Sequence, residues 1–204
     1  MIAFEITETE NDIEYKSLED SNSIRQQYFL ESIIHTAIRL ERRFISQTII
    51  KALNYHALAC LHANAGEYRP CQVHVNEFNP PVHYRIPALM DDFTNTVNNN
   101  WKTVNLFLLS AYVYWRLNHI HPFINGNGRT SRACCYFVLC VGSGGLIPGK
   151  ETLPRLLKAN KNECVELLKN ADSMWAEKRF PIEEIVTPLA NLIQTLINKQ
   201  TSTI

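Results

Sequence analysis

The chain has 204 residues, of which 46% are hydrophobic and 20% charged, a composition typical of one globular domain. Its 20 basic residues balance 20 acidic ones, so we expect neither nucleic acid nor a membrane surface as a partner. The longest apolar stretch, at 104–117, is interrupted by Asn105, Ser110 and Arg116 and is too short to span a bilayer. The acidic N-terminus lacks the pattern of a secretory signal, which indicates a cytoplasmic protein, with export as an effector as the alternative.

Hydrophobic periodicity predicts a mainly α-helical chain. Residues 1–20 have no sustained period and are interpreted as a polar lead-in, and residues 21–200 as a single domain. From the apolar spacing and the Gly and Pro positions we expect helices at about 22–38, 45–63, 87–97, 101–119, 129–142, 152–171 and 181–198. The segments at 101–119 and 129–142 are apolar enough to predict central, nearly fully buried helices.

One segment has the alternation of a β-structure. In CQVHVNEF, Val73 and Val75 alternate with His74 and Asn76, and Asn79-Pro80-Pro81 then forces a turn. This pattern predicts a small hairpin at about 71–85.

The stretch HPFINGNGRTSR at 121–132 carries the chemistry. Gly126-Asn127-Gly128 precedes a predicted helix, so successive backbone N–H groups can form a concave, anion-binding nest at a helix N-terminus. Arg129 and Arg132 are three residues apart and lie on one helical face, where two guanidinium groups suit a polyphosphate such as a nucleotide. The alternative is a simple turn with two solvated arginines.

His121 lies at the other end of this stretch. Pro122 favours an extended residue before it and ends the preceding helix. An imidazole beside a phosphate nest can accept a proton near neutral pH, whereas the alternative is a hydrogen-bonded core histidine. His119 and His121 together also suggest zinc, but no further ligand stands at a suitable local spacing.

The stretch resembles the signature of the Fic (Fido) family, H-P-F-x-(D/E)-G-N-G-R-x-x-R, at every fixed position but one. AGEYR at 65–69, PP at 80–81 and PALM at 87–90 resemble the family's flap region and the helix after it. The resemblance implies a helical bundle with a small β-hairpin flap. It also implies a protein adenylyltransferase that moves AMP from ATP to a Ser, Thr or Tyr hydroxyl of a target protein.

By this resemblance each site residue has a role. His121 is the catalytic base, Gly126, Asn127 and Gly128 cradle the phosphates, and Arg129 and Arg132 hold the β and γ phosphates. The flap binds the target segment by backbone pairing, through Val73, His74, Val75 and Asn76.

Asn125 is the departure from the signature, because the family has Asp or Glu there as the Mg²⁺ ligand. An amide oxygen coordinates a cation without supplying negative charge, so we expect weak Mg²⁺ binding or its replacement by Mn²⁺. Two alternatives follow: altered transfer chemistry, and a pseudoenzyme that binds a nucleotide as a regulatory module.

The family also has an inhibitory pattern, (S/T)xxxE(G/N), which this chain does not contain in strict form. Ser173 and Glu177 have the spacing, but Lys178 follows. Inhibition then uses a degenerate motif or a separate antitoxin-like partner, or does not occur. Association into a homo-oligomer is a further arrangement that we consider.

Overall fold

The computed structural model describes residues 9–75 and 77–201. Its helices are α2 (Ile13–Arg39), α3 (Gln47–Leu58), the 3-10 helix η1 (His83–Arg85), α4 (Ile86–Asn100), α5 (Leu106–Ile120), α6 (Asn127–Ser143), α7 (Leu153–Ala159), α8 (Lys161–Glu177) and α9 (Ile182–Thr201). The prediction of a mainly α-helical fold is confirmed. Of the described helices, none is both long and apolar enough to cross a bilayer.

Local capping explains where several helices begin and end. α2 begins at Ile13, well before the expected start at Asn22, because the Asp12 side chain accepts hydrogen bonds from the backbone N–H groups of Glu14 and Tyr15. The single helix expected at 152–171 is instead two helices, which meet at Asn160. The prediction of one helix there was wrong because apolar periodicity continues across such a break.

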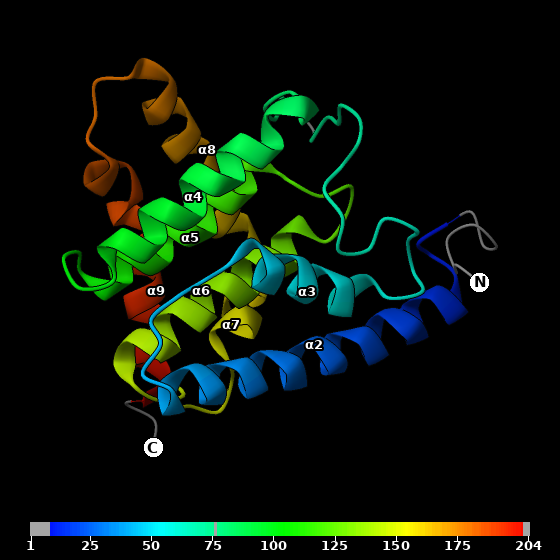
Figure 1. The fold of residues 1–204 in the computed structure, drawn as a ribbon, viewed down its shortest axis with the longest axis horizontal. Helices are drawn as coiled ribbons and strands as arrows, with labels where there is room; N and C mark the ends of the chain where they lie inside the picture. The colour runs from blue at the N-terminus through cyan, green and yellow to red at the C-terminus, as the bar shows by residue number, and fades with distance from the viewer. Residues whose placement is uncertain (1–8, 76, 202–204) are drawn as a thin grey trace.

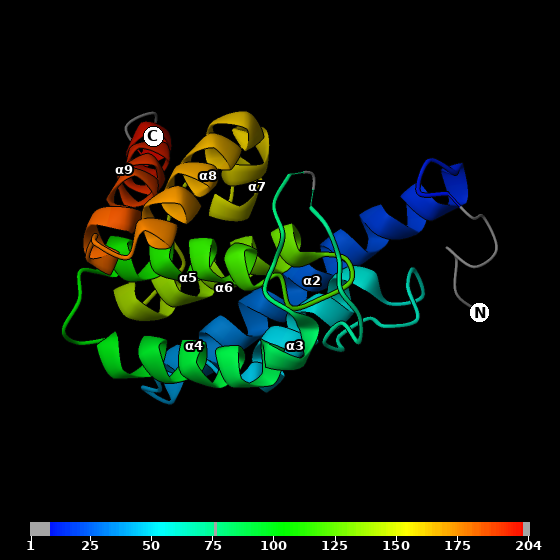
Figure 2. The ribbon, with the colours of Figure 1, turned by 90° about the horizontal axis from the view of Figure 1, so that it is seen from above.

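The helices form three layers around α5 and α6 (Figure 1). The view from above places α2, α3 and α4 on one side of the central pair, and α7, α8 and α9 on the other (Figure 2). Contacts of α5 with α6 and α9, and of α6 with α3 and α7, link the layers. The loop between α5 and α6 therefore starts and ends on the most buried elements of the chain.

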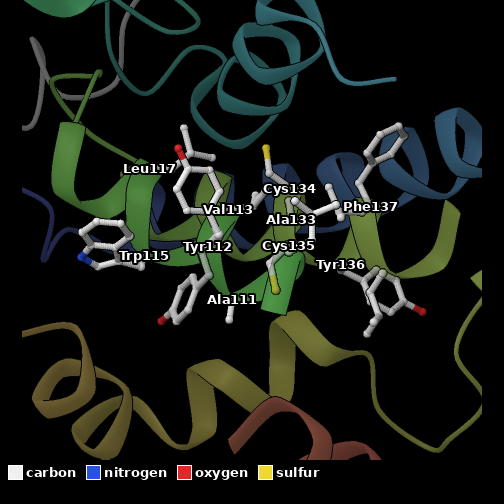
Figure 3. Packing of buried hydrophobic residues seen from close by; sticks show 14 of the residues in the cluster. Ala111, Tyr112, Val113, Trp115, Leu117, Ala133, Cys134, Cys135, Tyr136 and Phe137 are labelled. Carbon is white, nitrogen blue, oxygen red and sulfur yellow. The ribbon is translucent and has the colours of Figure 1, made fainter. Parts of the chain in front are cut away.

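The central pair forms the middle of the hydrophobic core. Figure 3 shows Tyr112 and Trp115 from α5 and Cys135, Tyr136 and Phe137 from α6 among the labelled core side chains, which point toward the layers on both sides. α5 is buried from Leu109 to Leu117, and α6 from Ala133 to Val141. The prediction of two central, buried helices is confirmed.

The expected β-hairpin does not form regular strands in the described part of the chain. Only two backbone bridges involve the described residues between α3 and α4. One joins Val75 to Phe78 within this segment, and the other joins Tyr68 to Phe123 of the loop between α5 and α6. Pro70, Pro80 and Pro81 have no N–H to donate to a ladder, which explains why alternation alone overestimated the strand. Figure 2 shows the segment as a long loop that projects from the helices.

Candidate functional site

The loop between α5 and α6 brings the predicted site residues together. His121 ends α5 in the left-handed region, with φ 51° and ψ 59°, and its N–H still donates to the Leu117 carbonyl. Gly126 is the N-cap of α6 with φ 74°, a conformation that favours glycine. A Cβ there would lie 2.9 Å from Leu58 Cδ1 and 3.0 Å from Asn54 Nδ2. The loop therefore turns sharply against α3.

Two buried asparagines hold the loop. Asn127 accepts from the Phe123 N–H at 3.0 Å and donates to the Phe123 carbonyl at 2.8 Å, so its side chain ties the loop and is turned away from any ligand. Asn54 of α3 donates to the Asn125 carbonyl at 3.0 Å and to Thr130 Oγ1 at 3.2 Å, and accepts from the Gly66 N–H. At Asn127, only the backbone is available to a phosphate.

The N-terminus of α6 is built to receive an anion. The first N–H groups of an α-helix have no acceptor within the helix, and the first intrahelical bond of α6 runs from the Thr130 N–H to the Gly126 carbonyl. Arg129 and Arg132 project from the same first turns, and both line a cavity between α2, α6 and α7. Arg132 lies against Gly128, whose added Cβ would be 3.3 Å from Arg132 Nη1. Both cations thus face one cavity beside the start of α6.

Glu19 of α2 occupies part of this anion-binding capacity. Arg129 Nη1 donates to Glu19 Oε1 at 2.9 Å, with the arginine side chain 21% exposed. The adjoining cavity measures about 100 Å³, below the roughly 300–1,000 Å³ of sites for small molecules. α2 therefore covers the cavity that Arg129 and Arg132 line.

His121 is held in its neutral form. The pKa of its imidazole falls from 6.5 to about 4, chiefly because of burial; a hydrogen bond with the Asn118 backbone opposes this shift, and the positive charge of Arg69 adds to it. At neutral pH one ring nitrogen therefore carries a lone pair that can accept a proton. The His121 carbonyl accepts from Arg69 Nε at 2.8 Å, which fixes the backbone that carries the ring.

Asn125, the predicted metal ligand, is not oriented for Mg²⁺. Its Oδ1 accepts from the Gly126 N–H at 2.6 Å and lies 3.4 Å from Arg129 Nη2, while its Nδ2 points to Glu10 and His62. Mg²⁺ prefers several oxygen ligands in octahedral geometry, and a neighbouring guanidinium opposes a cation. Within the described residues, no three His, Cys, Asp or Glu side chains form a metal cluster. Position 125 alone does not fit Mg²⁺.

The loop of the expected flap lies beside this site. His74 Nδ1 contacts Asn79 Oδ1 at 2.7 Å, and Val75 and Phe78 exchange backbone hydrogen bonds of 3.0 and 2.9 Å. Val73 is half-buried, and Asn76, the remaining predicted contact, lies outside the described residues. The loop tip packs on α5, because the rings of Phe78 and His119 are 5.5 Å apart.

His119 has a partner other than a metal. Its Nδ1 lies 2.6 Å from Asp172 Oδ1, and Trp115 Nε1 donates to the same oxygen at 2.9 Å. His119 thus links α5 to α8 through Asp172, whereas His121 begins the loop between α5 and α6.

Arg69 joins the flap loop to the candidate base. It is 2% exposed, and its guanidinium donates to the carbonyls of His121, Cys71 and Pro81. Its backbone N–H donates to the Pro122 carbonyl at 2.9 Å. One buried cation therefore ties both ends of the 71–81 loop to the residue that carries the imidazole.

Comparison with known proteins identifies this arrangement. Residues 44–139, which contain α3 to α5, the loop and most of α6, match the model of the Fic/DOC family. A Fic domain-containing signalling protein from Bacteroides thetaiotaomicron superposes with a TM-score of 0.69 at 22% identity, covering 89% of this chain and 70% of that one. Residues 44–139 form a Fic-family region. Fic-1 (residues 134–508) from C. elegans shares the fold with a TM-score of 0.66 at 21% identity, over 99% of this chain and 58% of that one.

Curated relatives of this chain include the proteins named protein adenylyltransferase Fic in Drosophila persimilis and Drosophila erecta. They are 31% and 32% identical over 131 residues, which is 62% of this chain. The match spans only about a quarter of their length, 25% and 26%.

Several contacts of the Fic-family loop lie outside the motif and were missed by sequence reasoning. Glu19, not Glu177, is the carboxylate at a motif arginine. Glu177 instead pairs with Arg179 at 2.6 Å, so the suggestion that Ser173–Glu177 forms an inhibitory motif finds no support. Glu10 and His62 also contact the loop. No local spacing marks these residues, because they reach the loop from far along the chain.

Proposed function

We propose that this chain transfers AMP from ATP to the hydroxyl of a protein side chain. The observation that carries the proposal is the position of a neutral His121 at one end of a six-residue turn that leads into an anion-binding helix terminus with two arginines. Relatives named as protein adenylyltransferases support the same reaction.

In this reaction His121 takes the proton of a Ser, Thr or Tyr hydroxyl. The oxygen of that hydroxyl attacks the α-phosphorus of ATP at the same time. The bond from the α-phosphorus to the bridging oxygen breaks, and pyrophosphate leaves. The N–H groups at the start of α6 stabilise negative charge on the phosphates. Arg129 and Arg132 hold the β and γ phosphates, which requires Arg129 to exchange Glu19 for a phosphate oxygen.

The flap loop is proposed to present the target. Val73, His74 and Val75 precede the turn at the tip, and backbone groups there can pair with an extended peptide by strand addition. Arg69 supports this role because it fixes both ends of the loop relative to His121.

A second candidate function is a nucleotide-binding regulatory module without turnover. The observation in its favour is that Asn125 supplies no carboxylate and that its oxygen is already bonded to the Gly126 N–H. This module would bind ATP at the same helix terminus, and an Asn125→Asp variant would still transfer nothing.

The test is labelling of a cell lysate by the purified chain with ATP carrying the label on the α-phosphate. We expect labelled protein with the wild type and none with His121→Ala, whereas His35→Ala, which removes an exposed histidine of α2, retains labelling. ATP labelled on the γ-phosphate should give no labelling beyond that of the lysate without the chain, because pyrophosphate leaves. Equal labelling by wild type and His121→Ala would refute the mechanism, and ATP binding without labelling in wild type and Asn125→Asp would establish the regulatory module.

A further inference from the structure

The connection between α2 and α3, residues 40–46, forms a surface remote from the loop between α5 and α6. It runs from the end of α2 to the start of α3 (Figure 1). Two adjoining hollows of about 620 and 410 Å³ share Arg42 and Phe44 as walls. Val141 of α6 lines the larger hollow, and it lies roughly 20 Å along the helix from Asn127, where α6 begins. The hollows are therefore separate from the candidate active site.

The turn that ends α2 fixes the start of this connection. The backbone N–H groups of Glu41 and Arg42 donate to the carbonyls of Ile38 and Ala37 at 3.0 and 2.8 Å, a pair of bonds that closes a helix C-terminus. Glu41 adopts φ 52° in this turn, a conformation that is uncommon for a residue other than glycine. The turn thus places Arg42 at the wall of both hollows.

Phe44 is exposed on a rigid support. The next residue, Ile45, is fully buried. The Asn98 side chain of α4 accepts from the Ile45 N–H and donates to the Ile45 carbonyl, both at 2.9 Å. Phe44 nevertheless leaves 53% of its surface exposed. A large aromatic side chain held at the surface beside two hollows is typical of a site that a partner covers.

The larger hollow carries unbalanced positive charge. Arg42, Arg43 and Lys102 line it together with one carboxylate, that of Glu41. Among the described residues, no ion pair includes any of these three cations. The whole chain has no net charge, so this excess is local and favours an anionic partner.

We propose that the two hollows bind an acidic peptide segment of a partner protein, whose bulky apolar side chains enter the hollows while its carboxylates contact the cations. Ile33, Ile49 and Phe137 line the smaller hollow and can bury such side chains. A guanidinium matches a carboxylate with two parallel hydrogen bonds. Nucleic acid would contact the cations but leave the apolar walls uncovered, and a flat membrane surface would not enter the hollows.

The test is binding of two matched series of fluorescein-labelled peptides to the full chain, measured by fluorescence anisotropy without ATP. In the acidic series, pairs of Leu, Phe or Trp residues at varied spacing are flanked by Glu, and in the basic series Lys replaces every Glu. We expect the acidic peptides to bind, their affinity to fall with added salt, and the basic peptides not to bind.

Variants of the two shared walls test the site itself. Arg42→Glu and Phe44→Ser should each weaken the acidic peptides by at least about tenfold, because each removes a central contact. Both side chains are exposed, so the variants should keep the fold, which circular dichroism checks. Matched controls are Arg85→Glu and Tyr84→Ser, at an exposed arginine and an exposed aromatic ring of η1, and they should leave the affinity unchanged.

A charge reversal tests the cations without relying on a loss. Arg42→Glu combined with Arg43→Glu turns the wall of the larger hollow acidic, and we expect this double variant to bind the basic series in place of the acidic one. An unfolded protein would not show such a gain. No change of preference in the double variant would contradict a role for these cations.

Three results would overturn the proposal: no binding of either series, equal binding of both, or unchanged affinity in Arg42→Glu and Phe44→Ser. Binding of phosphatidylserine vesicles without peptide binding would overturn it in favour of a membrane surface. A dimer in sedimentation that Phe44→Ser abolishes, again without peptide binding, would overturn it in favour of a second copy of the chain. Peptide binding requires neither ATP nor His121, so a failure of AMP transfer would contradict the proposed function alone.

Discussion

Replacing Arg69 with methionine tests whether one buried guanidinium holds the flap loop to the backbone of His121. Methionine keeps much of the aliphatic stem but removes the donors to three carbonyls, those of His121, Cys71 and Pro81. Arg69 is 2% exposed, so these acceptors lose their partner in a site with little access to water.

The magnitude follows from the three lost donors. A buried polar group left without a partner costs about 1–3 kcal/mol, and removing the buried charge offsets part of that total. The sum is a loss of about 3–5 kcal/mol in the free energy of unfolding. For a chain of this size, each kcal/mol lowers Tm by about 2–4 °C, so we expect Tm to fall by about 6–20 °C.

Thermal unfolding and limited proteolysis of the 71–81 loop measure the effect. Arg69→Lys keeps the charge but not the planar fork, and we expect an intermediate loss. Arg85→Met, at an exposed arginine of η1, should change the stability by less than about 0.5 kcal/mol. An Arg69→Met protein that melts within about 2 °C of wild type, with its loop cleaved no faster, would refute the reasoning.

Three further predictions address the loop and its cover. Gly126→Ala should lower the free energy of unfolding by about 2–4 kcal/mol in urea denaturation, since alanine is strained at φ 74° and its Cβ would meet Leu58; an unchanged midpoint would contradict this. Glu19→Gln should tighten ATP binding by about tenfold in calorimetry, because Arg129 is released and one negative charge is removed; unchanged affinity would mean that α2 does not compete with phosphate. The pKa of His121 is about 4 in the folded chain against 6.5 when exposed. Its neutral form therefore contributes about 3 kcal/mol to the free energy of unfolding. This contribution is complete above pH 6.5 and is lost as the pH falls toward 4. Chemical denaturation from pH 4 to 7.5 should show the free energy of unfolding rising with pH, and the rise should be smaller in His121→Gln.

The main features of the fold could be predicted from the sequence because local patterns determine them. Apolar spacing and helix caps act within a few residues, and they identified the two central helices, α5 and α6. Pro122 and the glycines of the 126–128 stretch likewise act on their own backbone, so the motif indicated both the turn and the helix N-terminus. The β-hairpin was overestimated because alternation says nothing of the hydrogen bonds that prolines cannot donate.

Tertiary structure alone decided which further side chains reach the motif. Glu10, Glu19 and His62 contact loop residues that are 115, 110 and 63 positions away in the sequence, and Arg69 reaches His121 across 52. Such contacts have no period or spacing in the chain, because they arise only when α2 and α3 pack against α6. The sequence by itself thus determined the central helices and the turn that leads into α6. Packing decided the burial of His121, the contacts of Glu19 with Arg129 and of Glu10 with Asn125, and the attachment of the flap loop by Arg69. Burial and long-range contacts exist only in the folded chain, so no local pattern predicts them.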